Sequence, residues 1–350
     1  MSANSIPPSN IGIAAINLGF GWAKISLDGV EEKFMSAVSP QHRSVAMMSA
    51  KSKNQLNLVH LDGEFFEVGL EAAVDALLEP MRLISRQWGR SQKYKILVQA
   101  ILNRMAHTGK KNWRILTGLA ADHYEDQQYR SEVVEVWRGS DGIHHTPYGS
   151  INILSVNIMP EIAGGFVSLK ADPVVREKMQ ALEGAVVDFG ALTTNWLPFR
   201  NGRPQSDGFR STDIGVHDAM TLATQSIQRY ALPNTKTVHL ESAVLGLQPL
   251  SILAKRRDGS TELQPLDITI DVHEAATKVW PQIEMALRIN LNDPKGMLLL
   301  GIGGGVKVYG NLFKQSFSES VCIVSDESQM QNVRGLYTMA KAYHESVSNS

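Results

Sequence analysis

The pattern of apolar residues at the start of the chain predicts two strands joined by a glycine turn. Residues 11–16 form a continuous apolar run, residues 18–21 hold two glycines, and residues 22–27 form a second strand-like segment. Two such segments separated by a tight turn are typical of a β-hairpin. We therefore expect a hairpin whose tip consists almost entirely of backbone.

A second unit of the same design occurs in the middle of the chain. Residues 184–189 predict a buried strand, residues 190–193 a glycine turn, and residues 194–199 another strand that ends at the turn Asn201-Gly202. This repetition indicates a weak internal duplication, and it places a domain boundary near residue 183.

Segments with strand and helix patterns alternate through the rest of the chain, which favours an α/β sheet. Further strands are predicted at residues 113–117, 151–159 and 295–302. Helices are predicted at residues 92–107, 272–291 and 306–316, and from a cap at Asp213 to about residue 230. Residues 254–265 are mostly polar, so we expect an exposed loop there.

The composition fits a soluble protein of two domains. The chain has 350 residues, 43% of them hydrophobic, which is more than a single core usually organises. With 34 Lys and Arg against 35 Asp and Glu the formal net charge is −1, so no basic field favours direct DNA or membrane binding. No run of about 18 apolar residues predicts a membrane span. Cys322 has no partner for an intramolecular disulfide, which fits a reducing cytoplasm.

The two glycine turns suggest a phosphate site. If they face each other across a domain cleft, their N–H groups could hold a triphosphate from both sides with little side-chain obstruction. Lys24 follows the first turn and can neutralise phosphate charge, while Thr193 in the second turn offers a hydroxyl. Asp188 precedes the second turn and is placed to hold a hydrated Mg²⁺, which usually takes one or two carboxylates together with phosphate and water.

Three segments resemble the nucleotide-binding motifs of the actin/Hsp70/hexokinase superfamily. Residues 15–24 (AINLGFGWAK) are similar to its first phosphate loop, residues 186–195 (VVDFGALTTN) to its second, and residues 299–306 (LLGIGGGV) to its adenosine motif. Within that superfamily the chain resembles the ParM/StbA plasmid-segregation ATPases at residues 116–124, 158–166 and 332–337. These segments occur in the family's order over nearly the whole chain.

The resemblance implies an α/β actin-like fold, in which two similar domains with mixed sheets flanked by helices surround a central nucleotide cleft. Residues 11–182 and about 325–350 would form domain I. Residues 183–324 would form domain II, with an inserted subdomain around residues 213–275. Residues 1–10 are expected to be a disordered lead-in.

The resemblance also implies roles for individual residues. Glu161 would position the water that attacks the γ-phosphate, and Asp188 with Asn17 would hold Mg²⁺. The residues expected to bind the nucleotide, ATP or GTP, are Leu18, Gly19, Phe20, Gly21, Lys24, Gly190, Ala191, Leu192, Thr193, Gly303, Gly304, Gly305 and Val306.

Three residues depart from the family's pattern. Asn17 stands where the first phosphate loop normally carries Asp, and Asn195 stands where the second loop usually ends in Asp. Leu192 stands where a small polar residue is common. Because a lost charge at Asn17 weakens metal binding, the sequence favours nucleotide binding more strongly than fast hydrolysis.

The function implied is an ATPase that polymerises into dynamic filaments and segregates plasmid DNA in the bacterial cytoplasm. Its partners would be further copies of itself and a small DNA-binding adaptor on a centromere-like plasmid site. Two alternatives keep the same fold. Asn17 and Asn195 leave a non-hydrolysing, nucleotide-binding scaffold open, and a small-molecule kinase is less favoured because no second carboxylate motif is well placed.

Overall fold

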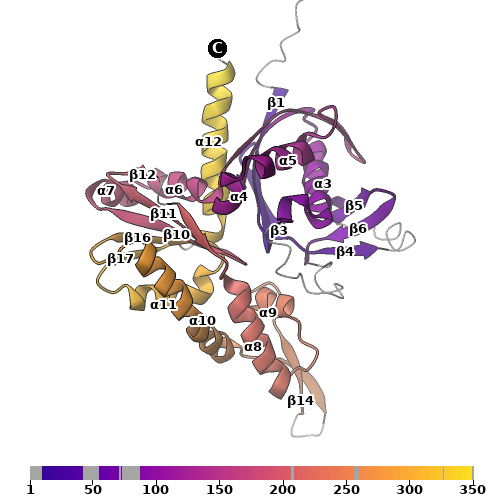
Figure 1. The fold of residues 1–350 in the computed structure, drawn as a ribbon. Coiled ribbons are helices and arrows are strands. Elements are labelled where there is room, and N and C mark those ends of the chain that lie inside the picture. The colour runs from indigo at the N-terminus through magenta and orange to yellow at the C-terminus, as the bar shows by residue number, and fades with distance from the viewer. Residues whose placement is uncertain are drawn as a thin grey trace, which may run out of the picture.

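Two mixed β-sheets, with helices on their faces, form the framework of the molecule (Figure 1). The computed structural model describes residues 10–41, 55–70, 72, 87–205, 209–255, 260–325 and 327–348. The expected disordered lead-in lies outside these ranges except for Asn10.

The first sheet contains the first predicted hairpin. Its strands are β1 (Ile11–Leu18), β2 (Trp22–Leu27), β3 (Val30–Met35), β7 (Asn112–Leu119), β8 (Ile143–Thr146) and β9 (Gly149–Pro160). They lie in the order β3-β2-β1-β7-β9-β8. β1 pairs antiparallel with β2 and parallel with β7, so the hairpin is extended by a crossover strand.

The second sheet repeats this arrangement around the second hairpin. Its strands are β10 (Gly184–Phe189), β11 (Thr194–Arg200), β12 (Arg203–Pro204), β13 (Arg210–Thr212), β16 (Leu298–Ile302) and β17 (Val321–Val324). β10 pairs antiparallel with β11 and parallel with β16, as β1 does with β2 and β7. The strands that carry the two glycine turns therefore occupy equivalent places in their sheets.

Helices cover both faces of both sheets. They are α3 (Gln92–His107), α5 (Gln127–Arg138), α6 (Glu161–Ala171), α7 (Pro173–Ala181), α8 (Val216–Tyr230), α10 (Thr269–Asn290), α11 (Val306–Ser316) and α12 (Gln331–Ser348). On the first sheet α3 and α5 pack in one core, and α12 packs in another. On the second sheet α6 and α7 cover one face, and α8, α10 and α11 cover the other.

The helices α6 and α12 cross between the two sheets at a pair of glycines. A Cβ atom placed on Gly335 of α12 would lie 1.7 Å from the carbonyl oxygen of Gly164 in α6. A side chain at either position would push the helices apart, since contacts this short do not occur between real atoms. The glycines thus allow the close approach that joins the two halves of the molecule.

Smaller elements extend the two halves. They are β4 (Val38–Gln41), η2 (Gln55–Asn57), β5 (Leu58–Leu61), β6 (Glu64–Val68), α4 (Ala121–Glu125), α9 (Thr237–Val244), β14 (Ser251–Lys255), β15 (Thr261–Pro265) and η5 (Ser328–Met330). β4, β6 and β5 form a separate three-stranded sheet. Among the described helices, none combines the length and the apolar character needed to span a bilayer.

Two predictions of local structure were wrong. Helix α8 begins after Gly215, whose N–H donates to the side chain of Asp218 over 3.0 Å, so Asp213 is not its cap. The loop expected at residues 254–265 instead belongs to a hairpin in which residues 251–255 pair with residues 261–265, with Leu253 opposite Leu263. Their polar character misled the prediction because both faces of a projecting two-stranded hairpin meet solvent. Residues 256–259, part of the same predicted loop, lie outside the described residues.

Candidate functional site

The two glycine turns are closed by the same hydrogen bond. In the first turn the N–H of Gly19 donates to the carbonyl of Trp22 over 3.1 Å, and in the second the N–H of Gly190 donates to that of Thr193 over 2.9 Å. Both bonds join residues that are three positions apart, and both turns directly follow the first strand of their hairpin. The duplication predicted from the sequence therefore extends to the geometry of the turns.

The tips of the two turns meet. A Cβ atom added to Gly21 would lie 2.9 Å from the Cβ of Ala191, so the backbones approach as closely as a glycine permits. The N–H groups of Phe20, Gly21 and Ala191 donate no hydrogen bond to any part of the chain that the structure describes. These donors remain available to an anionic ligand between the tips.

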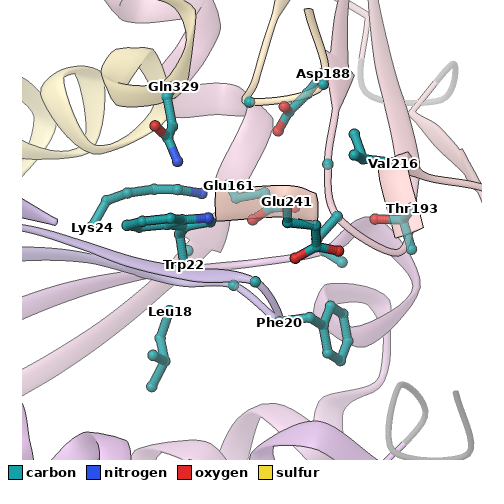
Figure 2. A pocket seen from close by; sticks show the side chains of 18 of the residues that line it. Leu18, Phe20, Trp22, Lys24, Glu161, Asp188, Thr193, Val216, Glu241 and Gln329 are labelled. Atoms are coloured by element: carbon teal, nitrogen blue, oxygen red, sulfur yellow. The ribbon is translucent and has the colours of Figure 1, made fainter. Parts of the chain in front are cut away.

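A pocket that is partly open to solvent lies where the turns meet. Figure 2 shows Lys24, Glu161 and Asp188 extending into it from different elements. The predicted site residues in its wall are Leu18, Gly19, Phe20, Gly21, Lys24, Glu161, Asp188, Gly190, Ala191, Thr193, Gly304 and Gly305. The predicted residues Asn17, Leu192, Gly303 and Val306 are not in this wall.

An aromatic side chain supports the first turn from behind. The indole Nε1 of Trp88 donates to the carbonyl of Leu18 over 2.9 Å, and its ring lies 4.9 Å from that of Phe20. Trp88 is 3% exposed, so the indole is held in the first core while its edge lines the pocket. The contact of Trp88 with the turn could not be predicted from the spacing of residues in the sequence.

The third glycine segment is bonded to the second turn's strand. The N–H of Gly305 donates to the carbonyl of Phe189 over 2.9 Å, and Gly303 has a φ of +90°, in the region that favours glycine. A Cβ on Gly303 would lie 2.2 Å from Oδ1 of Asp188. Gly303 therefore shapes the pocket by letting the Asp188 carboxylate lie against the backbone, although it does not line the pocket itself.

Two carboxylates share the inner end of the pocket. Glu161 is the first residue of α6, and its Oε1 accepts a hydrogen bond from Nδ2 of Asn195 over 3.2 Å. Burial, and then the nearby charge of Asp188, raise the pKa of Glu161 to about 7, against smaller opposite effects of Lys24 and the Asn17 amide. Burial also raises the pKa of Asp188, although Lys24 and Asn332 act in the opposite direction.

The raised pKa of Glu161 predicts a pH-dependent stability of the nucleotide-free protein. Between the ordinary pKa of a glutamate and about 7, the unfolded chain has lost this proton while the folded chain keeps it. The stability of the wild-type protein relative to Glu161→Gln should therefore fall as the pH rises through this window. By pH 8 the variant should be more stable by about 3 kcal/mol, and near pH 4.5 the two should match.

Urea denaturation of both proteins in EDTA at the two pH values measures this difference. A stability difference that does not change with pH would contradict the burial of an ionisable carboxylate at this position.

The inner end of the pocket suits a hydrated divalent cation bound together with a ligand's phosphates. No group of three His, Cys, Asp or Glu side chains among the described residues could hold a metal by itself. Asp188 offers one buried carboxylate, which matches the usual need of Mg²⁺ for few protein ligands, several waters and phosphate oxygens. Buried amide atoms without a hydrogen bond of normal geometry, on Asn17, Asn195 and Asn332, are suitable partners for such waters.

The outer end of the pocket is apolar and was missed by the sequence analysis. Its wall comes from α8, α9 and α11, and these side chains are Val216, Met220, Val244, Leu245 and Val308. They share this wall with Gly304 and Gly305. Helical apolar spacing in the sequence cannot distinguish a pocket wall from an ordinary core, which is why these residues had no signal.

Two charged residues from opposite halves of the molecule, Glu241 and Lys93, interact electrostatically, and the first of them lines this end of the pocket. Glu241 of α9 lines the pocket, and its Oε1 lies 3.4 Å from Nδ1 of His217. Burial lowers the pKa of Lys93 in α3 to about 8, and the charge of Glu241 partly opposes this. Lys93 also lies 5.6 Å from the ring centre of Trp88.

Comparison with known proteins finds similarity in structure but not in sequence. Neither the models of known protein families nor the curated proteins include a match to this sequence. Solved structures do match. A 15-stranded ParM filament from Clostridium botulinum has a TM-score of 0.69 at 18% identity, covering 95% of this chain and 99% of that one. The chain has the actin-like fold.

Two further actin-like structures match over nearly their whole length. ParM of Bacillus thuringiensis with ATP has a TM-score of 0.60 at 17% identity, covering 96% of this chain and 100% of that one. An archaeal actin homolog in complex with ADP has a TM-score of 0.65 at 18% identity, covering 95% of this chain and 99% of that one. The actin-like fold expected from the ParM-type motifs is thus confirmed.

Proposed function

We propose that this actin-like protein binds ATP with Mg²⁺ in the pocket between its two sheets, hydrolyses it, and polymerises into dynamic filaments. The meeting of the turns at Gly21 and Ala191, with Lys24, Glu161 and Asp188 directed into the same space, is the observation that carries the proposal. The neighbouring structures with ATP and ADP support a nucleotide as the ligand.

The pocket has separate regions for the two ends of a nucleotide. The free N–H groups of the two turns and the ammonium group of Lys24 would hold the β- and γ-phosphates. The apolar wall around Val216 and Val308 would cover the adenine, and Glu241 is near enough to the same wall to accept a ribose hydroxyl. GTP could occupy the same space, because no described side chain identifies the base by itself.

The carboxylates would divide the chemistry between them. Asp188 would hold Mg²⁺, and this ion when bound neutralises phosphate charge that develops during transfer. Glu161 would orient a water molecule in line with the γ-phosphate and accept its proton. Its pKa of about 7 suits a group that must accept a proton near neutral pH. The water oxygen bonds to the γ-phosphorus as the bond to ADP breaks.

Nucleotide binding can control assembly because the pocket lies between the two halves. One phosphate turn belongs to each sheet, so a triphosphate that contacts both favours the arrangement in which the turns are close. Hydrolysis removes contacts to one of them and weakens that preference. The arrangement that ATP stabilises before hydrolysis would present the surfaces that join copies in a filament, as expected for relatives of the ParM filament structure.

The cellular role follows from the ParM resemblance. A filament of this kind would push or pull plasmid copies apart in the bacterial cytoplasm, through a small DNA-binding adaptor seated on a centromere-like site. The near-neutral net charge of −1 supports an adaptor, because the chain itself has no strong general affinity for DNA.

Light scattering and pelleting with ATP, with ADP and without nucleotide test the proposal. Polymer is expected with ATP, and it should decay as phosphate is released. If the protein binds ATP but releases phosphate only at the background rate, a non-hydrolysing scaffold would be favoured. The structural argument for that alternative is the hydrogen bond from the Asn195 amide to Glu161. A protein that remains monomeric at high concentration in every condition would contradict the filament.

A further inference from the structure

A buried asparagine of α12 holds the carboxylate proposed for the metal. Nδ2 of Asn332 donates a hydrogen bond to Oδ2 of Asp188 over 2.6 Å. Each side chain is 4% exposed. Asn332 does not line the pocket, and its hydrogen bond to Asp188 is its direct link to a bound nucleotide. No other described side chain makes a hydrogen bond to this carboxylate.

The position of Asn332 is fixed by the helix crossing. A Cβ on Gly165 of α6 would lie 2.6 Å from Oδ1 of Asn332, and one on Gly164 would lie 2.2 Å from its backbone carbonyl oxygen. The neighbouring α12 residues Val333 and Leu336 are fully buried against the first sheet. The amide is therefore pressed between α6, which begins with Glu161, and β10, which ends beside Asp188.

We propose that Asn332 is a positioning residue that orients the Asp188 carboxylate for the Mg²⁺ of a bound nucleotide. The inference rests on the proposed function. A neutral amide donor stabilises a buried carboxylate without adding charge, and it occupies one oxygen so that the other keeps a fixed direction. Hydrogen bonds from outside the coordination shell tune metal affinity in this way.

The contact also ties the metal site to the framework. Asp188 lies on the second sheet, whereas Val333 and Leu336 of α12 pack against the first, so the bond between Asn332 and Asp188 links the second sheet to a helix that also packs on the first. A shift of α12 relative to the second sheet would release the carboxylate. The metal site can therefore form fully only when α12 and the second sheet keep this relative position.

Two variants separate hydrogen bonding from packing. Asn332→Ala removes the donor and leaves space, while Asn332→Leu removes the donor and keeps a similar volume. The measurement is the Mg²⁺ concentration that gives half-maximal enhancement of binding of a fluorescent ATP analogue. Both variants should need about tenfold more Mg²⁺ than the wild type, since a hydrogen bond to a charged group contributes about this factor. Binding of the analogue in EDTA should not change.

The control variant is Gln331→Ala on the same helix. Gln331 bonds Ser168 and Ser325 and does not contact Asp188, so the Mg²⁺ requirement should match that of the wild type. A normal Mg²⁺ requirement in Asn332→Leu would overturn the inference, as would an equal loss of binding in EDTA. Failure of the wild-type protein to bind the analogue at all would instead refute the proposed function.

Discussion

Replacing Glu161 by alanine is expected to lower the rate of ATP hydrolysis by about a hundredfold, while ATP binding and filament formation persist. The side chain lies at the start of α6, bonded to Asn195 and directed into the pocket opposite the phosphate turns. Without it, water is no longer oriented and its proton has no acceptor. Filaments should then last longer after ATP is added, because the nucleotide that holds them together is consumed slowly.

Phosphate release and light scattering, recorded on the same sample, measure both effects. Glu177→Ala provides a matched control, because Glu177 lies on the exposed face of α7 and should leave both readouts unchanged. Hydrolysis at the wild-type rate in Glu161→Ala would assign the proton acceptor to another group. Loss of ATP binding in Glu161→Ala would mean that Glu161 helps to bind ATP and does not act only in its hydrolysis.

Replacing Asp188 by alanine is expected to weaken Mg²⁺-dependent ATP binding by about a hundredfold, a free-energy loss of about 3 kcal/mol. Asp188 is the buried carboxylate nearest to the second phosphate turn, and in the described part of the chain no metal cluster could replace it. Affinity for ATP in EDTA should be unchanged or slightly higher, since the substitution removes a negative charge near the phosphates.

Asp213→Ala is the matched control for this substitution. Asp213 is exposed and lies outside the pocket wall, so its removal should not change the Mg²⁺ dependence. Titration of ATP at fixed Mg²⁺ and in EDTA gives both affinities. Equal Mg²⁺ dependence in Asp188→Ala and the wild type would show that the metal, if bound, is held elsewhere.

The phosphate turns could be predicted because their chemistry is local. Glycines at 19, 21 and 190, flanked by apolar strands, specify tight backbone tips whatever surrounds them, and the structure places both tips in one pocket. The equivalent pairing of β1 and β10 followed from the repeated pattern. Residues whose role depends on the conformation of their immediate neighbours in the chain were therefore found from the sequence.

Other parts of the site depend on contacts between distant segments. Asn332 lies 144 residues from Asp188 in the chain, and Glu241 reaches the pocket on the short helix α9, whose sequence has no distinctive pattern. Polar hairpins such as β14 and β15 give weak signals because neither face is buried in a core. The extent of the two domains stays a prediction. Any boundary between them has to account for the close crossing of α6 and α12 at Gly164 and Gly335.

Isothermal titration calorimetry of the wild-type protein with ATP and Mg²⁺ tests the central claim most directly. One nucleotide should bind per chain, with saturable heat that diminishes when Mg²⁺ is removed. The absence of heat with ATP, ADP and GTP alike would contradict a nucleotide site between the two glycine turns.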